Sequence, residues 1–121
     1  MKASRTNEGF TLVELMVVVL IIGILVAIAI PVFNAATASA SLRSCQSNQR
    51  TIEGACEQWV TAGNARATLA GSVDGSHILI TGNYVKSVPK CPTATAAQFY
   101  TLDASSTVSC PSTPPHAHYG S

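Results

Sequence analysis

The sequence predicts an α+β protein in which one long N-terminal helix packs against a small C-terminal head. Two observations carry this prediction. An apolar run that begins at Phe10 is too long for a strand, and the segment after it places apolar residues at helical spacing. Residues 63–121 contain short β-like runs separated by turn residues, as in a small sheet. With 121 residues, the chain has room for one such domain at most.

Residues 10–30 form the apolar run. As a helix rising ~1.5 Å per residue, the run would cross a hydrocarbon layer ~30 Å thick. Its β-branched residues suit a strand, but a lone strand leaves its backbone groups unsatisfied in lipid. We therefore expect an apolar transmembrane helix over residues 10–31.

An amphipathic helix is expected over residues 32–62. Five apolar residues recur at spacings of three, four and seven, which places them on one helical face. They are Leu42, Cys45, Ile52, Cys56 and Trp59. Gly63 and Asn64 are typical residues for the end of such a helix. The stripe must pack against the head, because the rest of the chain is its only candidate partner.

One carboxylate, Glu14, interrupts the apolar run, and no other charged residue follows before Arg43. Three interpretations compete. A secretory signal would use residues 35–38 (Ala-Ala-Thr-Ala) as its cleavage site. A plain membrane anchor explains the length and the basic residues Lys2 and Arg5, but not the acid. The third interpretation rests on the residues around the acid.

The stretch Gly9-Phe-Thr-Leu-Val-Glu14 resembles the processing site of the type IV pilins and pseudopilins. The resemblance implies a leader, residues 1–9, that a prepilin peptidase removes by cutting between Gly9 and Phe10, and it implies N-methylation of Phe10. It also implies the pilin fold, with residues 10–31 in the filament core. One position departs from the pattern, since Glu8 stands where a basic residue is usual.

The resemblance gives Glu14 a role in assembly. A carboxylate near the centre of a membrane helix costs about 2.5–3.5 kcal/mol, and less near the end. Cleavage would create a cationic amine on Phe10, which the Glu14 of a neighbouring subunit could neutralise. Opposite charges attract several times more strongly in a low dielectric than in water.

Gly23 and Pro31 both weaken a helix. They allow a simple kink, which membrane helices tolerate. The pilin resemblance offers a second possibility, in which the segment between them becomes extended in the filament. Both alternatives stay open.

Within the head, residues 98–102 and 107–110 read as a β-hairpin closed by Asp103-Ala-Ser-Ser106. Residues 77–85 fit a strand or a short helix equally well, and residues 63–76 read as a loop.

The four cysteines, Cys45, Cys56, Cys91 and Cys110, predict a disulfide framework in an exported head. Cys45 and Cys56 lie ~16 Å apart along a helix and cannot pair. We favour two bridges, each joining one helical cysteine to Cys91 or Cys110. The alternative is a Cys91–Cys110 bridge that leaves two helical thiols. No metal site is expected, because the sequence lacks the C-x₂-C knuckle of zinc sites.

Other chemistry is sparse. Residues 111–121 read as a polar tail that is mobile in part, with His116 and His118 in solvent. No paired carboxylates, phosphate loop or nucleophile–base pair is evident, so neither an enzyme nor a cofactor is expected. The net charge of +1 and the dispersed basic residues give no sign of specific nucleic-acid binding.

The expected function is that of a structural subunit in a type IV pilus-like extracellular filament. The resemblance implies a homo-oligomer that first sits in the cytoplasmic membrane with its head outside. It also implies the prepilin peptidase and the pilus assembly machinery as partners. The alternative is a competence or type II secretion pseudopilus subunit. The acidic calcium loop and the Asp-Pro-Trp-Gly stretch of the major secretion pseudopilin are not evident, which favours a pilus.

Overall fold

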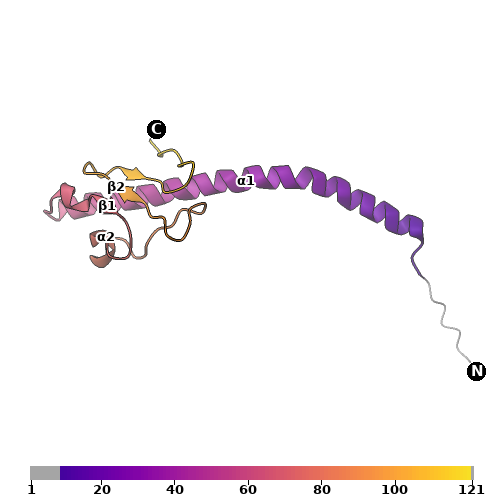
Figure 1. Cartoon of the computed structure of the whole chain (residues 1–121), viewed down its shortest axis with the longest axis horizontal. Helices are drawn as coiled ribbons and strands as arrows, with labels where there is room; N and C mark the ends of the chain where they lie inside the picture. The colour runs from indigo at the N-terminus through magenta and orange to yellow at the C-terminus, as the bar shows by residue number, and fades with distance from the viewer. Residues whose placement is uncertain (1–8, 121) are drawn as a thin grey trace, which may run out of the picture. The chain divides into compact units, whose positions relative to one another are not determined.

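The computed structural model describes residues 9–120. Internal contacts divide the chain into two units, residues 1–37 and residues 38–121, and each is described by itself. Most of the expected leader therefore lies outside the described residues. Within residues 9–120 the elements are one long helix, two short helical turns and a three-stranded antiparallel sheet (Figure 1). The predicted α+β class, with an apolar helix followed by a small sheet, is confirmed.

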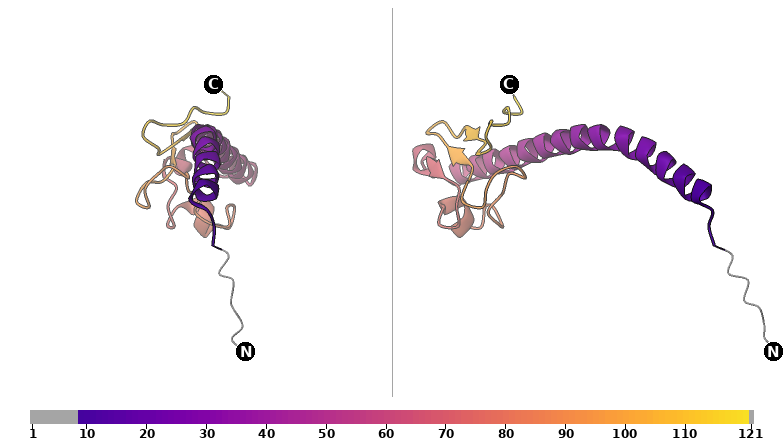
Figure 2. Two further views of the ribbon diagram at one scale, coloured as in Figure 1. Left: turned by 90° about the vertical axis from the view of Figure 1, so that its right-hand side faces the viewer. Right: turned by 45° about the vertical axis from the view of Figure 1, so that its right-hand side comes forward.

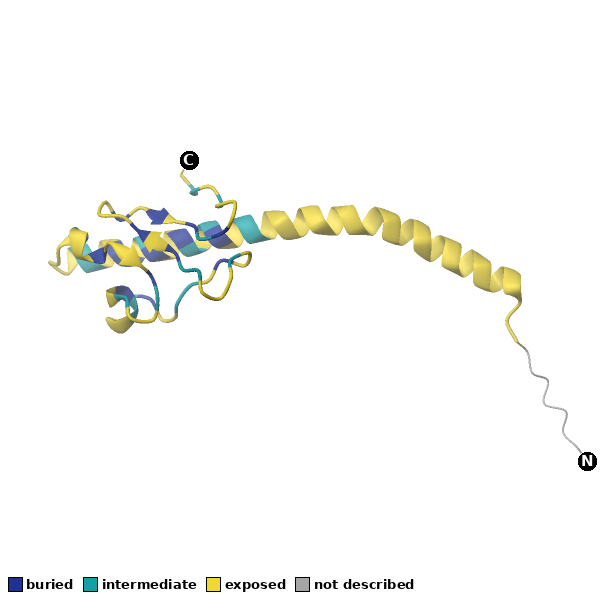
Figure 3. Ribbon diagram, viewed as in Figure 1, coloured by how far each residue is buried: buried dark blue, intermediate teal, exposed yellow. Residues whose placement is uncertain are grey.

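The long helix α1 spans Leu12–Thr61. In the first unit its side chains meet no core: every large apolar residue from Phe10 to Phe33 is exposed (Figure 3). Pro31 lies inside α1 and does not end it. A proline lacks the N–H that would bond one turn back, so one carbonyl loses its helical partner there. The helix here is held by its own backbone hydrogen bonds, because its apolar side chains pack against no other part of the described chain.

In the second unit α1 forms one wall of the core. Three residues of the predicted stripe are buried, and Leu42 and Trp59 are half-buried. The buried residues of α1 are Cys45, Gln49, Ile52, Ala55 and Cys56. The helix ends where Gly63 adopts a positive φ of 92° and donates its N–H to the carbonyl of Val60 at 3.0 Å. A left-handed glycine is a frequent helix terminator, so the predicted stop is confirmed.

Strands β1 (Gly71–Ser72), β2 (Thr101–Leu102) and β3 (Val108–Ser109) form an antiparallel sheet in the order β1-β2-β3. Leu102 pairs with Val108, and both are buried. Figures 1 and 2 show the sheet alongside the C-terminal part of α1. The predicted hairpin is confirmed. Asp103 closes it, because its carboxylate accepts the backbone N–H groups of Ser105 and Thr107 at 2.9 and 2.8 Å.

One stretch of the head differs from the expectation, and the structure decides between the two alternatives for another. Residues 63–76 are not simply a loop, because they hold the 3₁₀ turn η1 (Arg66–Leu69) and strand β1. A strand of two small residues has no hydrophobic period, so its pairing with β2 cannot be read locally. Residues 77–85 begin with helix α2 (Ile78–Thr81), where the His77 ring accepts the N–H of Leu79.

The C-terminal tail is docked on α1 through Glu53. His118 Nε2 lies 2.7 Å from Glu53 Oε1, and the Tyr119 hydroxyl donates to Glu53 Oε2. The Val108 N–H donates to Glu53 Oε1 at 3.2 Å, and the Arg50 guanidinium lies 4.8 Å from the centre of the Tyr119 ring. The expectation that His116 and His118 lie in solvent is therefore wrong. The polar sequence of the tail gives no sign that two of its side chains bind the Glu53 carboxylate on α1.

Acid should weaken this contact. Burial raises the pKa of Glu53, but hydrogen bonds from Tyr119, His118 and the Val108 amide outweigh it and hold the pKa below its ordinary value of 4.5. A depressed carboxyl pKa adds stability above that ordinary value, and this contribution is lost as pH falls through the folded pKa.

We predict that Glu53→Gln lowers the unfolding free energy by about 1–2 kcal/mol at pH 7, since a charged acceptor is lost from a partly exposed network. Thermal unfolding of the detergent-solubilised chain measures the effect. The difference between Glu53→Gln and the parent chain should shrink well below pH 4.5. Glu57→Gln is the control on the same helix: its pair with Arg66 is exposed, so solvent screens it. Equal effects of both substitutions would contradict the docking.

Candidate functional site

The expected cleavage site lies just before the helix. Gly9 and Phe10 are exposed, and the Phe10 side chain is 93% accessible. A Cβ added at Gly9 would meet no atom within 4 Å, so the fold itself does not require glycine there. The Gly9–Phe10 bond is thus outside α1 and uncovered by the rest of the described chain, which a peptidase requires of its substrate.

Glu14 takes part in a reciprocal cap of α1. The Thr11 backbone N–H donates to Glu14 Oε2 at 2.9 Å, and the Glu14 N–H donates to Thr11 Oγ1 at 3.2 Å. The Thr11 carbonyl accepts the first helical bond, from Leu15 at 3.2 Å. This is a capping box, which the Thr-x-x-Glu spacing signals in the sequence and which our sequence analysis missed. An ionised carboxylate has about four acceptor positions, so the cap leaves capacity for a further cation.

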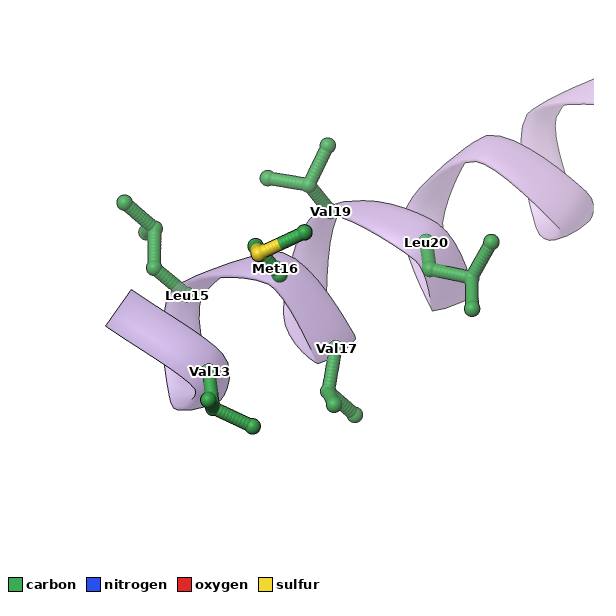
Figure 4. Close-up of a pocket in the computed structure, with 6 residues that line it drawn as sticks. All are labelled: Val13, Leu15, Met16, Val17, Val19 and Leu20. Atoms are coloured by element: carbon green, nitrogen blue, oxygen red, sulfur yellow. The ribbon is translucent and has the colours of Figure 1, made fainter. Parts of the chain in front are cut away.

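The helix after Glu14 presents apolar side chains in all directions. Figure 4 shows Val13, Leu15, Met16, Val17, Val19 and Leu20 projecting outward from the first turns. By length and composition, α1 is able to cross a membrane, with a mean hydropathy of 3.2 in its most apolar window and none of that window buried. Gly23 belongs to the same surface, and a Cβ there would also meet nothing within 4 Å. Neither Gly23 nor Pro31 is therefore explained by packing within the described chain.

Four donors from separate segments converge inside the head, and we call them the cysteine–histidine cluster. All their ligand atoms lie within 4.8 Å of one another. The members are Cys45, Cys91, Cys110 and His116. The three cysteines are buried and His116 is half-buried. Sequence reasoning missed His116, because nothing local indicates that the tail returns to the helical cysteine.

Cys56 stands outside this cluster. All four cysteines are thiols in the structure. Cys45 Sγ lies 2.7 Å from Cys110 Sγ, and Cys110 Sγ lies 3.7 Å from Cys91 Sγ. Cys56 is instead near Ser106, whose hydroxyl lowers its pKa while burial raises the pKa to about 11. The structure thus brings one helical cysteine to both head cysteines, and the second of the two favoured bridges finds no pair here.

The thiol environments within the cluster are unequal. Burial, followed by the contact with Cys110, raises the pKa of Cys45 to about 12. Burial also acts to raise the pKa of Cys110, but contacts with Cys45 and Ser112 outweigh it and lower that pKa. The Ser112 contact that lowers the pKa of Cys110 places the serine hydroxyl 3.2 Å from Cys110 Sγ.

Comparisons with known proteins agree with the N-terminal features. The family model for the prokaryotic N-terminal methylation motif matches residues 4–30. The fimbrial protein EcpC of Eikenella corrodens is 34% identical over 80 residues, which cover 61% of this chain and 52% of the relative. A fimbrial protein of Pseudomonas aeruginosa is 42% identical over 59 residues, 49% of this chain and 38% of the relative.

The match thus spans about half or less of the length of these curated relatives. No solved structure matches the chain. The chain thus carries the N-terminal methylation motif and is similar to fimbrial proteins over its N-terminal part.

Proposed function

We propose that this chain is a structural subunit of a type IV pilus-like filament, which polymerises through the first part of α1 after its leader is removed. The observation that carries the proposal is the exposed apolar surface from Phe10 to Phe33, in a chain whose start matches the methylation motif. Soluble proteins rarely expose an apolar surface of this size unless lipid or protein covers it. Lipid covers it before assembly, and the helices of other copies cover it in the filament.

Two further features support this proposal. The curated relatives are fimbrial proteins, so a structural role is favoured over catalysis. The head and the apolar surface occupy different units of the chain, so packing of the apolar surface leaves the fold of the head intact. Assembly therefore requires no unfolding of the core that Ile52 and Tyr100 help to form.

Glu14 holds two roles in this proposal. Its carboxylate caps α1 through Thr11 in the single chain. In the filament it also neutralises the Phe10 amine of a neighbouring copy, where an unpaired buried ammonium would cost several kcal/mol. These roles differ in what they need, because the cap needs an acceptor oxygen and the amine needs a negative charge.

The first prediction concerns processing. The chain recovered from sheared surface filaments should begin at N-methylated Phe10, as measured by intact-mass and N-terminal peptide spectrometry. Gly9→Ile should block the cut and hold the precursor in the membrane. Gly23→Ala is the matched control, because it also places a side chain in open space and leaves the cleavage site untouched. Filaments that retain residues 1–9 would contradict the proposal.

The second prediction separates the two roles of Glu14. Glu14→Gln keeps an acceptor suited to a capping box but removes the charge. Thr11→Val removes the hydroxyl of the cap, worth about 1 kcal/mol of helix stability, but keeps the charge. We expect Glu14→Gln to reduce filament yield severely and Thr11→Val to reduce it slightly.

The measurement is the ratio of the amount of sheared filament to the amount of processed subunit in the membrane. This ratio is independent of any effect of the substitution on cleavage. If Thr11→Val lowers this ratio as much as Glu14→Gln, then the acid serves the cap alone. If neither lowers it, Glu14 has no part in assembly.

A further inference from the structure

The geometry of the cysteine–histidine cluster points beyond a disulfide. His116 Nδ1 lies 3.5 Å from Cys91 Sγ and 3.6 Å from Cys110 Sγ. Cys91 Sγ and Cys110 Sγ are 3.7 Å apart. Three atoms of the cluster thus form a nearly equilateral triangle, and Cys45 Sγ closes the group from the side of α1.

These distances are those of a tetrahedral metal site. With Zn–S near 2.3 Å and Zn–N near 2.0–2.1 Å, the ligand atoms of a tetrahedron lie about 3.5–3.8 Å apart. Three of the distances within the cluster fall in that range. The contact between Cys45 Sγ and Cys110 Sγ is shorter, at 2.7 Å, and the other two distances from the cluster's atoms to Cys45 Sγ are within 4.8 Å. A central ion would need that pair to separate by about 1 Å, a small movement for a side chain.

A disulfide would leave much of this arrangement unexplained. It would join two sulfur atoms, while a third sulfur and an imidazole nitrogen would remain packed against them. The cysteines are 0%, 3% and 9% exposed, so these atoms have little access to solvent. Gln49 is also buried beside the cluster, with Nε2 3.9 Å from Cys45 Sγ and no partner for Oε1 among the described residues.

We propose that the cysteine–histidine cluster binds one Zn²⁺ ion as a closed, structural Cys₃His site. Thiolate and imidazole are the ligands that zinc prefers, and four protein ligands leave no open position for catalysis. On binding, the three thiols release their protons and coordinate as thiolates. A surface pocket lined in part by Gln49, Cys110 and His116 lies beside the cluster.

The contacts around the ligands support this assignment. Thr93 Oγ1 lies 3.3 Å from Cys91 Sγ, within reach to donate to a thiolate. Ser112 Oγ accepts the His116 N–H at 3.1 Å and donates to the Pro114 carbonyl at 2.9 Å, which fixes the turn that presents the imidazole. Such outer contacts orient the ligands of metal sites. The ion would join α1, the segment before β2, the end of β3 and the tail.

The test uses the full chain, solubilised in detergent and reduced without chelator. One equivalent of Zn²⁺ should bind, and Co²⁺ should give the visible bands of a tetrahedral thiolate complex. His116→Ala should weaken Zn²⁺ binding by more than the ~100-fold that loss of an outer contact costs. His77→Ala is the control, because it removes an imidazole that lies outside the cluster and does not dock the tail. His116→Cys should restore binding with an altered Co²⁺ spectrum, which shows that the tail still folds.

The state of the chain in its own cells gives the second measurement. Bound zinc should be present at one equivalent in membrane-extracted chain, with Cys45, Cys91 and Cys110 protected from alkylation until the zinc is removed. Failure of the reduced chain to bind Co²⁺ or Zn²⁺ would overturn the proposal. So would a Cys45–Cys110 or Cys91–Cys110 disulfide in the chain extracted from cells. Neither result depends on filament assembly, so this proposal and the proposed function fail independently.

Discussion

The constraint on which the rest depends is an apolar surface that the chain cannot bury by itself. From Phe10 to Phe33 the large side chains of α1 are exposed, and none of its most apolar window is covered by the described chain. Burial of apolar surface is worth roughly 25 cal/mol per Å², so this surface needs a second medium. A bilayer and a bundle of identical helices both satisfy it. In the proposed function, transfer of one subunit from lipid to filament would exchange one apolar environment for another, so the polar features of the helix would direct that exchange.

The head faces the opposite difficulty, because it is small. Its strands are two residues long, and a sheet this short has little stability of its own. The helix supplies one wall of its core, and Glu53 holds the tail in place. The cysteine–histidine cluster is a further contact between distant segments. Small domains commonly need such covalent or metal staples. The same helix thus forms one wall of the core of the head with its second half and leaves the apolar side chains of its first half exposed.

The sequence predicted the features that follow from local pattern. The long helix, its stop at Gly63, the buried stripe and the hairpin around Asp103 each have a periodic or turn signal, and the structure confirms them. The capping box was also readable, since Thr11 and Glu14 have the required spacing. Strand β1 was not readable, because two small residues carry no period. The docking of His116 and His118 depends on where the tail returns, which no local pattern of a polar segment encodes.

The central claim is that copies of this chain bury the first part of α1 against one another. The Glu14 carboxylate of one copy then neutralises the Phe10 amine of a neighbouring copy. A high-resolution reconstruction of filaments sheared from cells that make this chain tests it most directly. The account predicts a core built from the α1 helices, with residues from Phe10 to Phe33 packed between copies and each Phe10 amine within ion-pair distance of a carboxylate from Glu14 of a neighbouring copy. A filament core that lacks this chain, or Phe10 amines with no nearby Glu14, would contradict it.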